Sequence, residues 1–127
     1  MELLRSGVFI TFPGNCRKAL TFYQSCFGGT LHFEMLDSIM GETLEVPVVN
    51  GFLMSQNIII HGSDMVHDEG RTIGNYVAVF FTCRNAIHRK ALVNKLTSLH
   101  NLLAPASEQD KLIEVTDVFD VRWILAV

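Results

Sequence analysis

The sequence lacks any concentration of positive charge. Its 10 Lys and Arg residues are outnumbered by 13 Asp and Glu, the formal net charge is −3, and basic residues never gather beyond a pair. Proteins that bind nucleic acids rely mainly on clustered positive charge that neutralises phosphates. We therefore expect no nucleic-acid partner.

Long apolar segments are also absent. The longest candidates, such as Tyr76 to Phe81, have the length of a strand, whereas a membrane-spanning helix needs about 18 or more apolar residues. The early apolar run after Arg5 stops at Pro13 without a small-residue cleavage site, which argues against a secretory signal. We expect no membrane association and a cytoplasmic location.

Cysteine is scarce, and the odd number of three predicts free thiols in a reducing compartment. Cys16 and Cys26 stand ten residues apart in a predicted helix, so their positions differ by about 15 Å along its axis. A disulfide needs Cα atoms within roughly 7 Å, and a shared metal ion is equally out of reach. We expect Cys26 to be a small core residue. For Cys16 a second interpretation is open, because a helix N-terminus lowers the pKa of an accessible thiol.

Apolar residues, in contrast, are plentiful: they make up 49% of the 127 residues and include nine Phe. A chain of this size buries roughly two-thirds of its unfolded surface, which is enough for a real core. The first half predicts a strand over Leu3 to Phe12, then a helix capped by Asn15 and ended by Gly28 and Gly29. Strand patterns follow at Thr30 to Leu36, Leu44 to Met54 and Asn57 to His61, the last two forming a hairpin.

The element order then recurs. Tyr76 to Thr82 predicts a strand, Asn85 to Leu99 a helix with Ala91, Leu92, Leu96 and Leu99 on one side, and Lys111 to Val127 a second hairpin. A repeat period of roughly 65 to 70 residues favours an internal duplication. We expect one domain, residues 1–127, built from two modules at about 1–64 and 75–127 and joined by a loop at about 65–74.

Two motifs at the ends of the chain resemble a known family. GNCRKALTFYQSCFGG, from Gly14 to Gly29, is similar to the opening helix of the PhnB-like branch of the vicinal oxygen chelate superfamily, which includes glyoxalase I, bleomycin-resistance proteins and extradiol dioxygenases. VTDVFDVRWIL, from Val115 to Leu125, is similar to the closing hairpin of that branch, with Asp120 where Gly is usual. The resemblance implies an α+β fold in which two paired βαβββ modules form curved mixed sheets around a cleft, commonly in homodimers.

The resemblance also says where a metal would be bound. Metal-dependent members direct His, Gln or Glu side chains into the cleft, where the ion polarises substrate oxygens. Carried over to this chain, the cleft positions hold mostly apolar residues: Val8, Ile10, Phe12, His61 and Ile124. Only His61 resembles a ligand, so we expect no metal and no other cofactor. Two weaker alternatives are a loop metal among His61, Asp64, His67, Asp68 and Glu69, and a general base at Glu34, Glu45 or Glu114.

An apolar, Phe-rich cleft without metal ligands favours binding of a small hydrophobic molecule over catalysis. We therefore expect a glyoxalase/bleomycin-resistance-like binding protein that forms homodimers. A metal-dependent lyase or dioxygenase of the same superfamily is one alternative. The other is a non-catalytic dimeric interaction module, with which the positive mean hydropathy is compatible.

Overall fold

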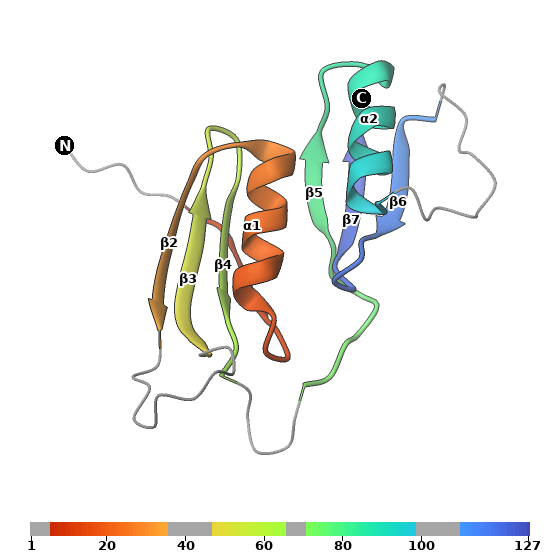
Figure 1. Ribbon diagram of the computed structural model, residues 1–127. Coiled ribbons are helices and arrows are strands. Elements are labelled where there is room, and N and C mark those ends of the chain that lie inside the picture. The colour runs from red at the N-terminus through yellow and green to blue at the C-terminus, as the bar shows by residue number, and fades with distance from the viewer. Residues whose placement is uncertain (1–5, 36–46, 66–70, 99–109) are drawn as a thin grey trace. The chain divides into compact units, whose positions relative to one another are not determined.

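The computed structural model describes residues 6–35, 47–65, 71–98 and 110–127 of the chain (Figure 1). The chain divides into two compact units, Met1–Thr72 and Ile73–Val127. The described elements of the first unit are β1 (Val8–Thr11), α1 (Cys16–Phe27), β2 (Thr30–Met35), β3 (Val48–Met54) and β4 (Ile59–Ser63). Those of the second unit are β5 (Val79–Thr82), α2 (Ala86–Leu96), β6 (Leu112–Thr116) and β7 (Arg122–Ala126).

The strands of the first unit form a mixed sheet in the order β1-β4-β3-β2. β1 runs parallel to β4, and the other neighbours are antiparallel. α1 packs on one face of this sheet and buries side chains that recur at helical spacing: Cys16, Ala19, Leu20 and Tyr23. Cys26, which we expected in the core, is only half-buried. The sheet contributes fully buried residues to the same core, such as Leu53 and Ile60.

The start of α1 is held by a residue from the far end of its own unit. The backbone N–H groups of Gly14 and Cys16 donate to Oδ1 of Asp64, at 3.1 and 2.9 Å, and the N–H of Val48 donates to Oδ2 at 2.9 Å. The predicted cap by Asn15 is wrong: its side chain makes no capping bond, and its Oδ1 is buried without a hydrogen-bond partner. A carboxylate is the stronger acceptor for these N–H groups.

The exit of α1 follows the prediction. Gly28 and Gly29 have φ angles of 73° and 106°, in the region that only glycine enters freely. Gly29 has a second constraint, because an added Cβ would lie within 3 Å of the backbone of Met54 and Ser55. The pair therefore turns the chain from the helix into β2 at a point where the backbone of β3 passes closely.

The second unit repeats the arrangement of the first. Its sheet has the order β5-β7-β6, with β5 parallel to β7 and β6 antiparallel to it, as β1, β4 and β3 are arranged. α2 lies over this sheet (Figure 1) and buries Arg89, Leu92 and Leu96. The predicted apolar face is wrong at Ala91, which is exposed while Arg89 is buried.

The closing hairpin is organised by a buried aspartate. Oδ1 of Asp117 accepts hydrogen bonds from the backbone N–H groups of Phe119, at 2.7 Å, and Val121, at 3.1 Å. Its Oδ2 accepts from Nε1 of Trp123 at 2.8 Å. Asp120 completes the turn with a positive φ of 67°, which explains why a glycine suits this position. Trp123 is fully buried and belongs to the core of the second unit.

Candidate functional site

Each sheet has one face toward its helix and one face away from it, which we call the open face. In the first unit a Cβ added to Gly62 would meet Sγ of Cys16 and the ring of Phe12, so Gly62 faces α1. Side chains alternate between the faces of a strand, and His61 therefore lies on the open face. The described residues that share this face by strand register and alternation are Phe9, Thr11, Thr30, His32, Glu34, Asn50, Phe52, Met54, Ile59 and Ser63.

Four of these side chains form a continuous line across the sheet. Phe9 on β1 pairs with His61 on β4, His61 pairs with Phe52 on β3, and Phe52 pairs with His32 on β2. The rings of Phe52 and His32 stack with centroids 5.2 Å apart, and those of Phe52 and His61 are tilted with centroids 5.7 Å apart. We call Phe9, His61, Phe52 and His32 the aromatic row. It offers ring faces and two imidazoles at one level of all four strands.

The sequence-derived cleft residues fall on different faces. Val8 and Ile10 pair with Ile60 and Gly62, so they lie on the α1 side of the sheet. Phe12, just beyond β1, is fully buried. His61 lies in the aromatic row, and Ile124 lies on the open face of the second sheet, between Phe80 and Glu114. The structure thus brings Phe9 rather than Val8, Ile10 or Phe12 to the side of His61.

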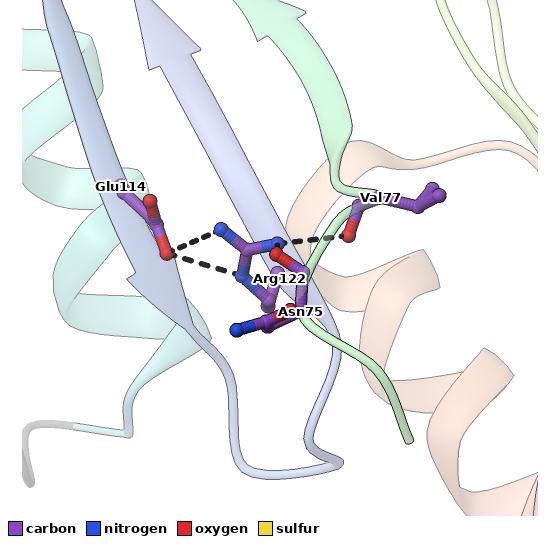
Figure 2. Close-up of polar contacts among 4 residues, drawn as sticks. All are labelled: Asn75, Val77, Glu114 and Arg122. Carbon is purple, nitrogen blue, oxygen red and sulfur yellow. Dashed lines mark hydrogen bonds and ion pairs between the residues drawn. The ribbon is translucent and has the colours of Figure 1, made fainter. Parts of the chain in front are cut away.

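The open face of the second unit carries an ion pair instead of an aromatic row. Oε2 of Glu114 accepts from Nε and Nη2 of Arg122, at 3.1 and 2.7 Å. Figure 2 shows the same guanidinium reaching the carbonyl groups of Asn75 and Val77, in the segment that leads into β5. Glu114 is therefore neutralised by a bidentate partner, which suits a structural role better than that of a general base.

The buried cysteines are poor nucleophiles. Burial, with a further contribution from the nearby Asp64 carboxylate, raises the pKa of the Cys16 thiol to about 12. Burial also raises the pKa of Cys83, although Arg89 opposes the shift. All three cysteines are free thiols, as expected. The interpretation of Cys16 as an acidified first-turn thiol is wrong, because Cys16 is fully buried and the charge beside it is negative.

Several solved structures resemble this chain over nearly its whole length. A Pseudomonas aeruginosa protein is 23% identical with a TM-score of 0.74, and the match covers 98% of this chain and 97% of that protein's chain. The PhnB protein of Bacillus cereus is 19% identical with a TM-score of 0.73, and covers 97% and 98%. The fosfomycin resistance protein FosX of Mesorhizobium loti is 12% identical with a TM-score of 0.58, and covers 99% and 91%.

PhnB-like and FosX proteins both belong to the vicinal oxygen chelate superfamily. This chain has the glyoxalase/bleomycin-resistance-like fold. The mixed α+β architecture expected from the sequence is confirmed, with two small mixed sheets and two helices in the described residues. No family model matches the sequence, and no curated protein matches it. Neither described helix is long and apolar enough to cross a membrane.

A divalent ion is part of at least one protein with this fold, since the FosX of Listeria monocytogenes was solved in complex with Mn(II). The described residues of this chain do not fit such an ion, because they contain no group of three His, Cys, Asp or Glu side chains that could hold one. His32 and His61 lie two strands apart, about 10 Å, with Phe52 between them. A single ion needs donor atoms that each reach within about 2 Å of it.

The remaining acidic and histidine residues that we considered as metal ligands or general bases do not form one site. Both carboxylate oxygens of Asp64 accept hydrogen bonds from backbone N–H groups. Glu34 lies exposed at the β2 edge of the open face. Glu45, His67, Asp68 and Glu69 lie outside the described residues. The aromatic row was not predicted, although the alternation in TLHFEM, Thr30 to Met35, does assign His32 and Glu34 to one face.

Proposed function

We propose that this protein binds a small, flat hydrophobic molecule on the aromatic row without a catalytic metal. The observation that carries the proposal is the register of Phe9, His61, Phe52 and His32, which places four rings on one level of the open face. Phe9 is 61% exposed and so offers ring surface at the end of the row. Offset stacking and edge contacts between rings contribute about 0.5–1.5 kcal/mol each beyond area burial.

The row also explains why the ligand would be flat. Neighbouring strands lie about 4.8 Å apart, and the two measured ring pairs are separated by 5.2 and 5.7 Å. A fused bicyclic ring can therefore touch two or three members at once, whereas a globular aliphatic molecule of the same volume would touch fewer. The imidazole nitrogens of His32 and His61 add hydrogen-bonding groups at the rim of the same surface.

The test uses 2-naphthalenemethanol, a neutral bicyclic probe, titrated by isothermal calorimetry. Phe52→Ala removes the central ring and is expected to weaken binding roughly fivefold, the equivalent of about 1 kcal/mol. Leu112→Ala is the control, because Leu112 is 57% exposed and lies in the other unit. Saturable binding that Phe52→Ala weakens and Leu112→Ala does not is the expected result. Absence of binding, or equal affinity in both variants, would refute the proposal.

The metal-dependent alternative has its own test. Elemental analysis of the purified protein, with thermal unfolding in the presence of Mn²⁺, Zn²⁺ and Ni²⁺, should show no stoichiometric ion and no stabilisation, because the described residues do not assemble a ligand set. A tightly bound stoichiometric ion would replace the binding proposal with an enzymatic one.

A specific observation also supports the dimeric interaction module. The second unit exposes Tyr76, Val77 and Ile87 to 90%, 62% and 81%. Tyr76 and Val77 are neighbours in the chain, and contiguous exposed apolar surface is typical of association sites. We propose a homodimer in addition to the ligand site, and sedimentation equilibrium of the wild type and of Ile87→Glu tests it. A wild type that is monomeric at all concentrations would exclude the homodimer.

A further inference from the structure

One cationic side chain lies beside the aromatic row. Nη1 of Arg71 donates to the carbonyl oxygen of Thr11 at 3.1 Å. The N–H of Phe12 donates to Ser63 on β4, and in a trans peptide the preceding carbonyl points the opposite way. The carbonyl of Thr11 thus points away from β4, toward the outer edge of β1 in the described sheet. The Arg71 guanidinium is therefore placed along that edge.

The Arg71 side chain has unused binding capacity. A guanidinium carries five N–H donors, and in the described parts of the chain the carbonyl of Thr11 is its hydrogen-bond partner. The other arginines near a sheet or helix face are engaged differently: Arg122 is paired with Glu114, and Arg17 lies over the ring of Phe33 at 5.6 Å. A half-buried guanidinium that has one neutral acceptor among the described residues is suited to a bidentate oxyanion.

The position of Arg71 relative to the row matches a small aromatic acid. Thr11 lies two residues along β1 from Phe9, which is about 7 Å, and both side chains are on the open face. A naphthalene ring placed over Phe9 and His61 can direct a carboxylate to this end of β1. The hydroxyl group of Thr11 supplies a further donor on the same face.

The charges at the two edges of the sheet determine toward which edge the acidic group of such a ligand points. Among the residues assigned to the open face of the first unit, the charged one is Glu34 on β2, at the opposite edge of the sheet from β1. Three strand spacings separate the two edges, about 14 Å. An anionic group is repelled from the Glu34 edge and attracted to the Arg71 edge, while the rings between them take the apolar body.

We propose that the ligand of the aromatic row is an aromatic acid, whose carboxylate or other oxyanion is bound by Arg71 at the outer edge of β1, the edge away from β4. This inference rests on the proposed function and adds the class of ligand to it. It assigns Arg71 as a residue that determines specificity, and predicts discrimination between an acid and its neutral analogue on the same ring system.

The experiment compares three probes that share one ring: 2-naphthoate, 2-naphthalenemethanol and 2-naphthylmethylammonium. Each is titrated into the full-length wild type, Arg71→Gln and the matched control Arg84→Gln, an exposed arginine of the other unit. The acid is expected to bind the wild type about tenfold more tightly than the alcohol, as one charge-assisted contact provides. The ammonium should bind more weakly than the alcohol.

Arg71→Gln should abolish the preference for the acid while leaving the affinity for the alcohol within about twofold, and Arg84→Gln should change neither. Added salt should weaken only the acid. Equal binding of acid and alcohol, or a preference that survives Arg71→Gln, would overturn the role of Arg71 and leave the binding of neutral ligands intact. If no probe binds, the proposed function falls and the inference falls with it. Circular dichroism and the Tm of each variant identify a change that comes from unfolding.

Discussion

Replacing Asp117 should destabilise the second unit more than any surface change, because this carboxylate holds the closing hairpin together. It is 4% exposed and accepts hydrogen bonds from two backbone N–H groups and from Nε1 of Trp123. Hydrogen bonds to a charged acceptor contribute about 1.5–3 kcal/mol each, and a buried donor left alone costs about 1–3 kcal/mol. The three bonds share one group, so their contributions are not additive.

For Asp117→Ala we expect a loss of about 4 kcal/mol in the free energy of unfolding, out of a total on the order of 10 kcal/mol for a domain of this size. Trp123 is the single tryptophan and reports directly on the hairpin, so urea unfolding followed by its emission measures the change. Asp117→Asn keeps an acceptor for the backbone but loses one oxygen, and should lie between the wild type and Asp117→Ala.

Asp110→Ala provides the control, since Asp110 is exposed and a surface change is expected to stay within about 0.5 kcal/mol. If Asp117→Ala does not fold, the free energy of unfolding is measured instead for Asp117→Asn and for Trp123→Phe, with circular dichroism as the signal. A loss below about 1 kcal/mol for Asp117→Ala would show that the turn is held by packing and that these hydrogen bonds contribute little.

The remaining predictions concern the first unit and the turn. Asp64→Ala should lower the free energy of unfolding by about 3 kcal/mol, since three backbone donors lose a charged acceptor; urea unfolding beside Asp110→Ala measures it, and a change no larger than the control contradicts it. Asp120→Gly should stabilise the protein by about 0.5–1 kcal/mol by relieving a positive φ, and a lower Tm would count against that strain. Cys16 should make stability fall at alkaline pH: below pH 9 its thiol is neutral in both states, whereas above pH 9 only the unfolded state ionises it readily, because the folded pKa is about 12. The free energy of unfolding should drop by about 1 kcal/mol from pH 9 to pH 10 through this group, and an equal drop in Cys16→Ala would refute its origin.

Local sequence signals were sufficient to predict that both helices exist and that Gly28 and Gly29 end α1. The GNCRKALTFYQSCFGG stretch predicted α1 because the spacing of its apolar residues and its two glycines act within a few residues of each other. The cap of the same helix could not be predicted from local sequence, because Asp64 reaches it from 48 residues away. A nearby Asn suggested a cap, but only the tertiary structure shows which carboxylate arrives there.

The sequence pattern also failed to predict which side chains of β1 lie on which face of the sheet. From Val8 to Phe12 every position except Thr11 is apolar, so the alternation does not say which side chains face the helix. The register with β4 decides it: Val8 and Ile10 align with Ile60 and Gly62, while Phe9 aligns with His61. A shift of one residue exchanges the two faces completely. The aromatic row depends on four strands being in register, and no single segment of the sequence contains that information.

Because the two units have the same arrangement, their open faces can be compared position by position. Phe12 donates its N–H to Ser63 after β1, and Cys83 donates its N–H to Ala126 after β5, so these residues occupy equivalent positions. Counting back along the strands, Phe9 corresponds to Phe80 and His61 to Ile124, and the strand partners of the latter pair are Phe52 and Glu114. The first unit thus keeps rings where the second has an aliphatic residue and a carboxylate.

That difference assigns separate roles to the two halves of one fold. Glu114 occupies the place of Phe52, yet its charge is neutralised by Arg122, which also holds the segment before β5. Among the described residues, Arg71 has the guanidinium donors that an anion could use, beside the aromatic row. Restoring a ring in the second unit with Glu114→Phe would release Arg122 from its partner, and should therefore cost stability there without improving ligand binding in the first unit.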